Sequence, residues 1–156
     1  MGRAMDQIVV RSMAKWPDVP DVYGWLSLDR RGNWLIKDEK IGNVALREFI
    51  ARNYQPDAQG RWFFQNGPQR VFVKLAYTPL IVRHEGDALL DHCGRHFHPE
   101  MFFLDEEGSV LVLGRAGIAL LDDRDLGWYA DRADTFARIG SCEVPRRFVF
   151  VADPAP

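Results

Sequence analysis

The stretch that decides the fold is Leu28-Asp29-Arg30-Arg31-Gly32-Asn33-Trp34-Leu35, which recurs as Leu104-Asp105-Glu106-Glu107-Gly108-Ser109-Val110-Leu111. In both copies an aspartate opens a turn and a glycine closes it, as a tight β-hairpin requires. The copies lie close to half a chain length apart, and each is followed by an isoleucine and then a helical pattern. Two explanations stay open: internal duplication of a strand-turn-strand-helix unit, or the same turn chemistry in two unrelated hairpins.

Short strand patterns dominate the rest of the chain. They cover residues 25–28, 33–37, 61–65, 70–77, 80–83, 88–90, 101–104, 109–113 and 147–151. Helical spacing is confined to residues 5–16, a segment beginning near Asn43, and residues 123–138. These patterns predict an α+β fold with antiparallel sheets and two or three helices. We expect one compact unit over residues 1–156, with sub-halves at 22–90 and 91–153 after the N-terminal helix 5–16.

Composition narrows the class of protein. Of the 156 residues, 47% are hydrophobic and 27% are charged, which excludes collagen-like, disulfide-scaffold and disordered chains. A net charge of −2 gives no electrostatic reason for a nucleic-acid or membrane partner. Two cysteines form no disulfide framework, and the N-terminus has no apolar signal segment, so we expect a cytoplasmic protein.

The layout resembles that of a known family. The resemblance rests on four parts of the sequence. They are the run 29–41 with Gly32 and Trp34, a short helix, the segment 57–64, and the strand ending at Tyr77-Thr78-Pro79-Leu80. This order resembles an uncharacterised proteobacterial family, domain-of-unknown-function family 1285 or a sister family, over about residues 22–132. The resemblance implies a duplicated β-rich fold, a second half similar to a pleckstrin-homology barrel, and a ligand site between the halves. It implies no catalytic residue, and Asp91-His92-Cys93-Gly94 departs from the family pattern.

One predicted strand carries a candidate ligand site. Alternation along residues 70–77 places Val71, Val73 and Leu75 toward the core. Arg70, Phe72 and Lys74 then share the other face, so that two cations flank an aromatic ring. Such a face suits an anionic or nucleotide-like small molecule, and we add His92 as a further anion contact. The alternative is a sheet face with only a packing role.

The segment Asp91–His98 offers different chemistry. It contains His92, Cys93, His96 and His98, and imidazole and thiolate ligate zinc or copper. Structural zinc sites usually draw ligands from two separate segments, and no second cluster exists in the sequence. A solvated loop is therefore the expectation, with metal binding as the alternative. A cysteine-dependent enzyme using Cys93 is a further alternative, but no nucleophile or phosphate-loop motif accompanies it.

The sequence therefore predicts a non-enzymatic, cytoplasmic small-ligand-binding or regulatory domain with its site between two similar halves. The expected ligand-binding residues are Arg70, Phe72, Lys74 and His92. No metal and no cofactor is predicted.

Overall fold

The computed structural model describes residues 6–8 and 19–156. The helix predicted over 5–16 lies, apart from residues 6–8, outside the described residues. The chain divides into two compact units. Unit 1 contains the described residues up to Asp29, together with Asn33–Ala76 and Phe150–Pro156; unit 2 contains Arg30–Gly32 and Tyr77–Val149.

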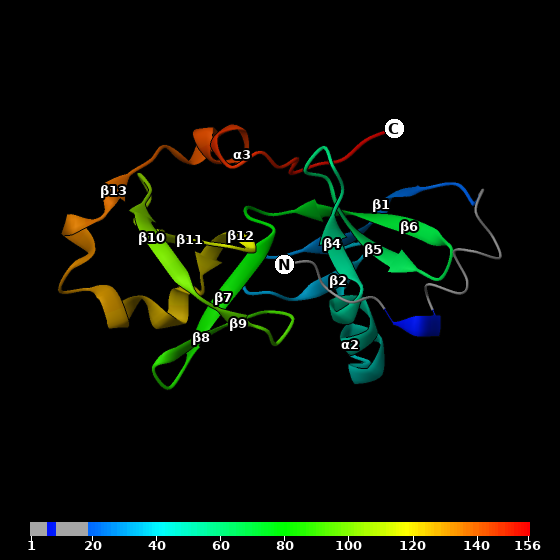
Figure 1. The fold of residues 1–156 in the computed structure, drawn as a ribbon, viewed down its shortest axis with the longest axis horizontal. Coiled ribbons are helices and arrows are strands. Elements are labelled where there is room, and N and C mark those ends of the chain that lie inside the picture. Colours follow the sequence, from blue (N-terminus) through cyan, green and yellow to red (C-terminus); the bar gives the residue numbers. More distant parts are fainter. Residues whose placement is uncertain (1–5, 9–18) are drawn as a thin grey trace. The chain divides into compact units, whose positions relative to one another are not determined.

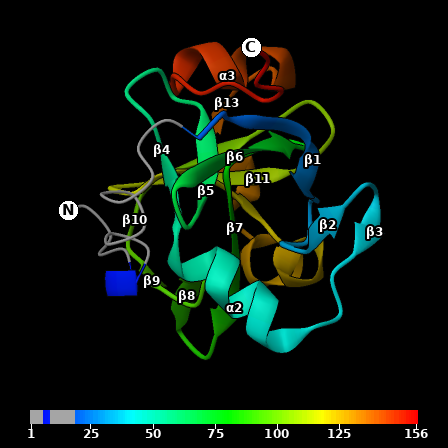
Figure 2. The same ribbon diagram turned by 90° about the vertical axis from the view of Figure 1, so that its right-hand side faces the viewer.

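Unit 1 is built on a six-stranded sheet with the order β3-β2-β1-β6-β5-β4 (Figure 1). Its strands are β1 (Val22–Leu28), β2 (Trp34–Ile36), β3 (Glu39–Lys40), β4 (Tyr54–Pro56), β5 (Trp62–Asn66) and β6 (Gln69–Leu75). Neighbouring strands are antiparallel except β1 and β6, which are parallel and adjacent (Figure 2). Two three-stranded meanders are thus joined along one parallel pair.

In unit 1 the helix α2 (Val44–Arg52) follows the first meander. Asn43 caps it as predicted, because its side-chain oxygen accepts the Leu46 N–H at 3.0 Å. Ile50 and Ala51 in the last turns are buried, whereas Val44 and Leu46 in the first turns are exposed. The helix therefore packs firmly through its C-terminal half alone.

Unit 2 is built on a seven-stranded sheet with the order β13-β10-β11-β12-β7-β8-β9. Its strands are β7 (Leu80–Glu85), β8 (Ala88–Asp91), β9 (His96–Phe97), β10 (Pro99–Leu104), β11 (Val110–Gly114), β12 (Gly117–Leu121) and β13 (Ala137–Arg138). The pairs β7–β12 and β10–β13 are parallel, and the others are antiparallel. The fold class is therefore α+β, as predicted, with mixed sheets in which antiparallel pairs predominate.

The two sheets share one strand order. Read from β9 to β10, unit 2 repeats the order of unit 1 read from β3 to β4, including the central parallel pair, which is β1 with β6 in unit 1 and β7 with β12 in unit 2. The structural repeat matches different turns from those that the sequence pattern matched. The Asp29 turn joins β1 to β2, but the Asp105 turn joins β10 to β11, whose counterparts in unit 1 are β4 and β5. The structural counterpart of the Asp105 turn is therefore the Asp57 turn.

The sequence echo has a local cause. Four turns share one geometry, in which an aspartate carboxylate accepts the N–H of the residue four positions on and the glycine between them has positive φ. These are Asp29 with Gly32, Asp57 with Gly60, Asp91 with Gly94, and Asp105 with Gly108, with glycine φ between 80° and 83°. Glycine adopts this conformation without the steric penalty of a side chain. The local similarity of Asp29 and Asp105 thus reflects turn chemistry.

Two predicted elements near the C-terminus are wrong. The helix expected over 123–138 is two short 3-10 helices, η1 (Asp123–Tyr129) and η2 (Ala133–Thr135), followed by β13. Gly127 interrupts the α-helical pattern, and the three-residue spacing of Leu126 and Tyr129 suits a 3-10 turn. The strand expected over 147–151 is absent from the described structure: η3 (Ser141–Glu143) leads into α3 (Val144–Arg147), which has a proline in its first turn, and only Val151 of the expected strand forms a single bridge.

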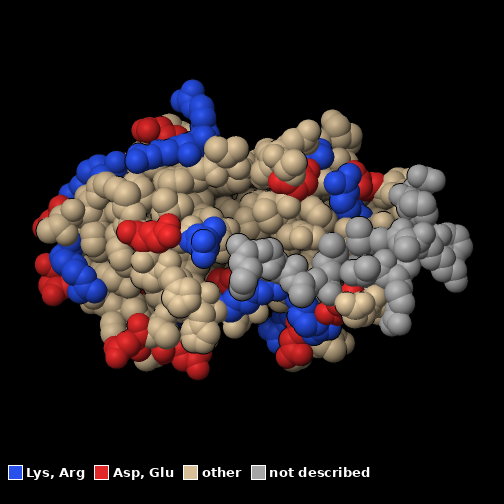
Figure 3. Space-filling view, in the orientation of Figure 1, with Lys and Arg blue, Asp and Glu red and all other residues tan. Residues whose placement is uncertain are grey.

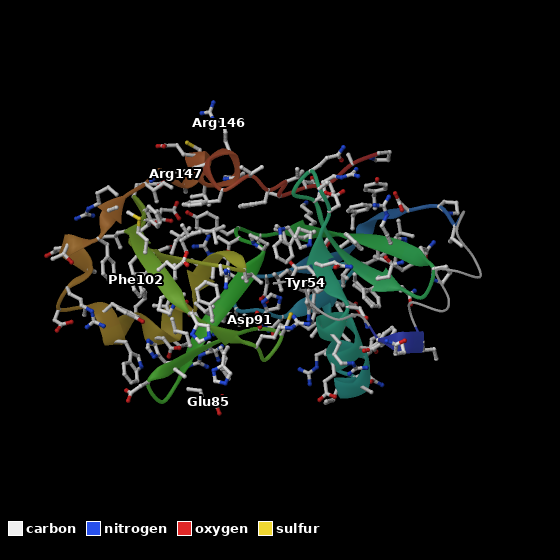
Figure 4. The ribbon with its side chains drawn as sticks, viewed as in Figure 1. Tyr54, Glu85, Asp91, Phe102, Arg146 and Arg147 are labelled. Carbon is white, nitrogen blue, oxygen red and sulfur yellow. The ribbon has the colours of Figure 1, made fainter. Side chains whose placement is uncertain are left out.

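Each unit has its own apolar core. In unit 1 it includes Leu28, Ile50, Tyr54 and Val73, and in unit 2 Leu80, Phe103, Leu111 and Ile118, all almost fully buried (Tyr54 is labelled in Figure 4). Among the described residues, no helix has the length and apolar character needed to cross a membrane.

Candidate functional site

The predicted cation–aromatic face of β6 is occupied by the protein's own side chains. Phe72 is only 1% exposed, and the ring of Tyr23 stacks on it with centroids 4.9 Å apart and planes at 7°. The Arg61 and Arg70 guanidinium groups lie 4.6 Å and 5.2 Å from the centroid of the Phe72 ring. The stacking and the cations expected of a ligand contact are thus supplied within unit 1.

Charge on this face is also largely paired internally. Arg70 donates two hydrogen bonds to the Asp21 carboxylate, at 3.0 Å and 2.8 Å. Arg61 donates a single side-chain hydrogen bond, from Nε, to the Asp57 carboxylate at 2.8 Å. Lys74 is exposed. Sequence reasoning missed Arg61 and Tyr23, because both reach Phe72 from distant positions in the chain.

His92 lies in unit 2, whereas Arg70, Phe72 and Lys74 lie in unit 1. The Nδ1 atom of His92 accepts the Ile81 N–H at 3.2 Å, so the neutral ring carries its proton on Nε2. His92 lines a pocket of about 430 Å³ within unit 2. The described residues that line it are Arg31, Gly32, Ile81, Arg83, His84, Glu85, Leu90, Asp91 and His92.

The pocket in unit 2 is polar and its charges are balanced. Arg83 donates two hydrogen bonds to Asp125, at 3.2 Å and 3.1 Å, and Arg31 pairs with Asp123. Glu85 lies at the tip of the β7–β8 hairpin, and its side chain points outward from the hairpin (Figure 4). Because both guanidinium groups already have carboxylate partners, an anion entering here would have to compete with existing ion pairs.

His84 connects the lining of this pocket to an aromatic cluster. The His84 ring stacks on Trp128 with centroids 4.1 Å apart, and its Nε2 lies 2.8 Å from the Tyr129 hydroxyl. Burial raises the pKa of Tyr129, so this hydroxyl stays protonated across the neutral range. Asp125 accepts the His84 backbone N–H at 2.8 Å and thereby fixes the position of the histidine.

The Asp91–His98 segment serves a structural purpose. The Asp91 carboxylate accepts the N–H groups of Cys93 and Arg95, which closes the turn between β8 and β9. His96 and His98 are exposed, and their ring centroids lie 6.5 Å apart. Within the described ranges, no three His, Cys, Asp or Glu side chains converge as metal ligands would.

Unit 1 contains a second pocket of different chemistry. Its volume is about 410 Å³, and it lies against β1, β2, β5, β6 and the helix α2. Eight of its residues are apolar and two are amides: Val22, Trp25, Leu26, Ile36, Leu46, Ile50, Phe64, Val71, Asn66 and Gln69. Because Val71 lines it, the pocket lies on the opposite side of β6 from Arg70, Phe72 and Lys74. The sequence had predicted Val71 to be a core residue.

Trp25 marks the mouth of this apolar pocket. It is 50% exposed, whereas Trp34 and Trp62 of the same unit are buried. Gly24 has a φ of 76°, and the pairing of β1 with β6 is irregular between Val22 and Leu26. Such a bulge redirects a side chain, which simple alternation does not anticipate. The Lys37 ammonium group lies 4.5 Å from the centroid of the Trp25 ring.

Surface charge is mixed. Basic and acidic side chains both occur on the face of the described residues shown in Figure 3, and the basic ones include a continuous band along the upper edge of unit 2. The two pockets differ in their linings: the pocket of unit 1 is apolar, and the pocket of unit 2 is polar and charge-balanced.

Comparison with known proteins places the chain in a family. The model of family DUF2944, described as a protein of unknown function (DUF2946), matches residues 5–150, and the chain belongs to this family. No curated protein matches the sequence.

Two solved structures are similar in fold. A DUF1285 family protein from Silicibacter pomeroyi DSS-3 is 16% identical, with a TM-score of 0.55 over 82% of this chain and 85% of that chain. A DUF1285 family protein from Shewanella baltica OS155 is 15% identical, with a TM-score of 0.51 over 71% of this chain and 91% of that one. These likenesses confirm, for the fold, the resemblance to family 1285.

Proposed function

We propose that this family member is a non-enzymatic binding protein that holds a small apolar molecule in the pocket of unit 1. The observation that carries the proposal is the half-exposed Trp25 on the wall of an apolar pocket of about 410 Å³. Pockets for small molecules are typically about 300–1,000 Å³, mainly apolar, and supplied with a few polar groups for orientation. The amides of Asn66 and Gln69 are such groups.

The composition of the pocket favours binding over catalysis. The described residues of its lining include no acid, base or nucleophile: the polar members are amides, which orient a ligand but exchange no protons near neutral pH. Four strands and a helix form the walls, and strand walls change little when a ligand enters. Covering the exposed apolar surface would contribute about 25 cal/mol for each Å² removed from water.

The cellular setting is part of the same proposal. Neither the half-buried Cys93 nor the exposed Cys142 forms a disulfide, which suits a reducing compartment such as the cytoplasm. A regulatory role would follow if binding changed the stability of unit 1, because a ligand that binds only the folded form stabilises it by mass action.

Nile red, a neutral apolar dye, tests the proposal in the full-length protein. We expect saturable one-to-one binding with a rise in dye fluorescence. Val71→Phe should fill the pocket and abolish binding, because Val71 lines it. Val44→Phe is the matched control, since Val44 is exposed on α2 and lies outside the lining. Absence of saturable binding, or unchanged binding by V71F, would overturn the proposal.

A further inference from the structure

The turn between β2 and β3 carries an unusual residue pair. Lys37 and Asp38 form this two-residue turn, with φ of 48° and 68°. Left-handed backbone at both positions is typical of a type I′ turn, which favours Asn-Gly. Lysine has no preference for this conformation, so the backbone at Lys37 is held there at some cost in stability.

Lys37 is held beside the mouth of the apolar pocket. Its N–H donates to the Trp25 carbonyl oxygen at 3.0 Å, and its ammonium group lies over the Trp25 ring. Among the described residues, no carboxylate forms an ion pair with Lys37. A cation with an aromatic contact and no carboxylate partner at the edge of an apolar pocket can still accept an anion.

Neighbouring charges on β3 divide between the two faces of the sheet. Glu39 pairs with Ile36 in the register of β2 and β3, so it shares the face of the pocket, because Ile36 lines it. Lys40 pairs with Leu35 and therefore faces the opposite way. The negative charge of Glu39 thus weakens the positive potential that Lys37 creates at the pocket. Lys40 is a nearby lysine on the opposite face and can serve as a control for Lys37.

We infer that the ligand of unit 1 is an amphipathic monoanion, an apolar body with a single carboxylate-type head that Lys37 binds at the mouth beside Trp25. The inference rests on the proposed function and specifies its ligand class. The apolar lining accepts the body, and Lys37 supplies the positive charge for the head. An exposed ion pair of this kind contributes little affinity, so the body provides most of the binding and the head provides selectivity.

Decanoate and decan-1-ol separate the two contributions, because they share one chain and differ in head-group charge. Titration calorimetry at low salt should show decanoate binding about two- to fivefold more tightly than decan-1-ol to the native protein. The difference should shrink as salt is added. Lys37→Gln should abolish the preference without weakening decan-1-ol binding, and Lys37→Arg should retain it.

Two further variants control for general charge effects. Lys40→Gln should keep the preference, and Glu39→Gln should enlarge it. Lys37→Asn should raise the melting temperature, because asparagine tolerates the left-handed turn, and yet remove the preference, so a folding defect cannot explain the loss. Equal binding of both ligands by the native protein, or a preference that survives in K37Q, would overturn the inference alone. Failure of both ligands to bind would overturn the proposed function and the inference with it.

Discussion

Asp125 shows how one side chain organises the wall of the polar pocket. Its side chain is 8% exposed, and its carboxylate binds both the Arg83 guanidinium and the His84 backbone N–H. The hydrogen bonds from Arg83 lower the pKa of Asp125, an effect that burial opposes and the His84 N–H reinforces. The folded protein therefore favours the ionised carboxylate.

Asp125→Asn should accordingly destabilise the protein in a pH-dependent way. The folded-state pKa lies below that of the unfolded chain, so the stabilisation is complete above about pH 4 and is lost as pH falls through the folded-state pKa. At pH 7 we expect a loss of about 1–3 kcal/mol in the free energy of unfolding. The difference between native protein and variant should shrink below pH 4.

Urea unfolding across this pH range measures the effect. Asp123→Asn is the control, because Asp123 is 63% exposed in its pair with Arg31 and such pairs contribute little. A D125N deficit that is as large at pH 3 as at pH 7 would contradict the assignment of the stabilisation to the ionised carboxylate.

Among the elements, the turns were the most predictable. An aspartate with a glycine three positions on specifies its own hydrogen bonds, so hairpins at residues 29–32 and 105–108 could be assigned from sequence. The C-terminal helices were not predictable in the same way. The apolar pattern after Asp122 fits the three-residue spacing of a 3-10 helix as well as the four-residue spacing of an α-helix. Only the contacts of η1 within unit 2 decide between these two helix types.

Gly32 and Gly108 have nearly the same φ, 82° and 83°, but different surroundings. A Cβ atom added at Gly108 would meet no atom within 4 Å, whereas one at Gly32 would lie 2.7 Å from the His92 Cβ. Gly108→Ala should therefore destabilise by about 1 kcal/mol, the penalty of left-handed backbone alone. Gly32→Ala should lose a further 1–3 kcal/mol, roughly, because His92 must move.

Chemical denaturation of the two variants gives both free energies. The comparison is internally controlled, since the same substitution is made in the same turn type. Equal losses would show that His92 adjusts without strain and that its position between Gly32 and Ile81 is not tightly fixed.

For the molecule as a whole, the sequence predicted the fold class and a repeated arrangement, but not the register of the repeat or the apolar pocket. Alternation in β6 correctly placed Arg70 and Phe72 on one face, where the Arg70 guanidinium lies over the Phe72 ring and Tyr23 stacks on that ring. It could not show that Tyr23 and Arg61 cover Phe72. Nor could it show that Val71 borders a pocket, because α2 covers only part of that face and the bulge after Gly24 redirects Trp25. Both facts depend on residues distant in sequence.

The chain returns to unit 1 at its C-terminus, which makes that unit discontinuous in sequence. Phe150 is buried in unit 1, and the two residues after it pair with that unit's backbone. Val151 N–H donates to Gly60 at 2.9 Å, and Leu75 N–H donates to Ala152 at 2.7 Å. Phe148, two positions earlier, belongs to unit 2, where its ring lies 5.4 Å from that of Phe103.

Phe148→Ala and Phe150→Ala should therefore weaken different units, although the two sites are almost adjacent in the chain. Removing the buried Phe150 ring should destabilise unit 1 by about 3–5 kcal/mol, and the half-buried Phe148 should have a smaller effect. In native-state hydrogen exchange, F150A should speed exchange of the Leu75 and Val151 amides before that of Ile139, whose N–H donates to Leu104 in unit 2. F148A should show the reverse order. Equal acceleration of all three amides in both variants would mean that the two cores unfold as one cooperative unit.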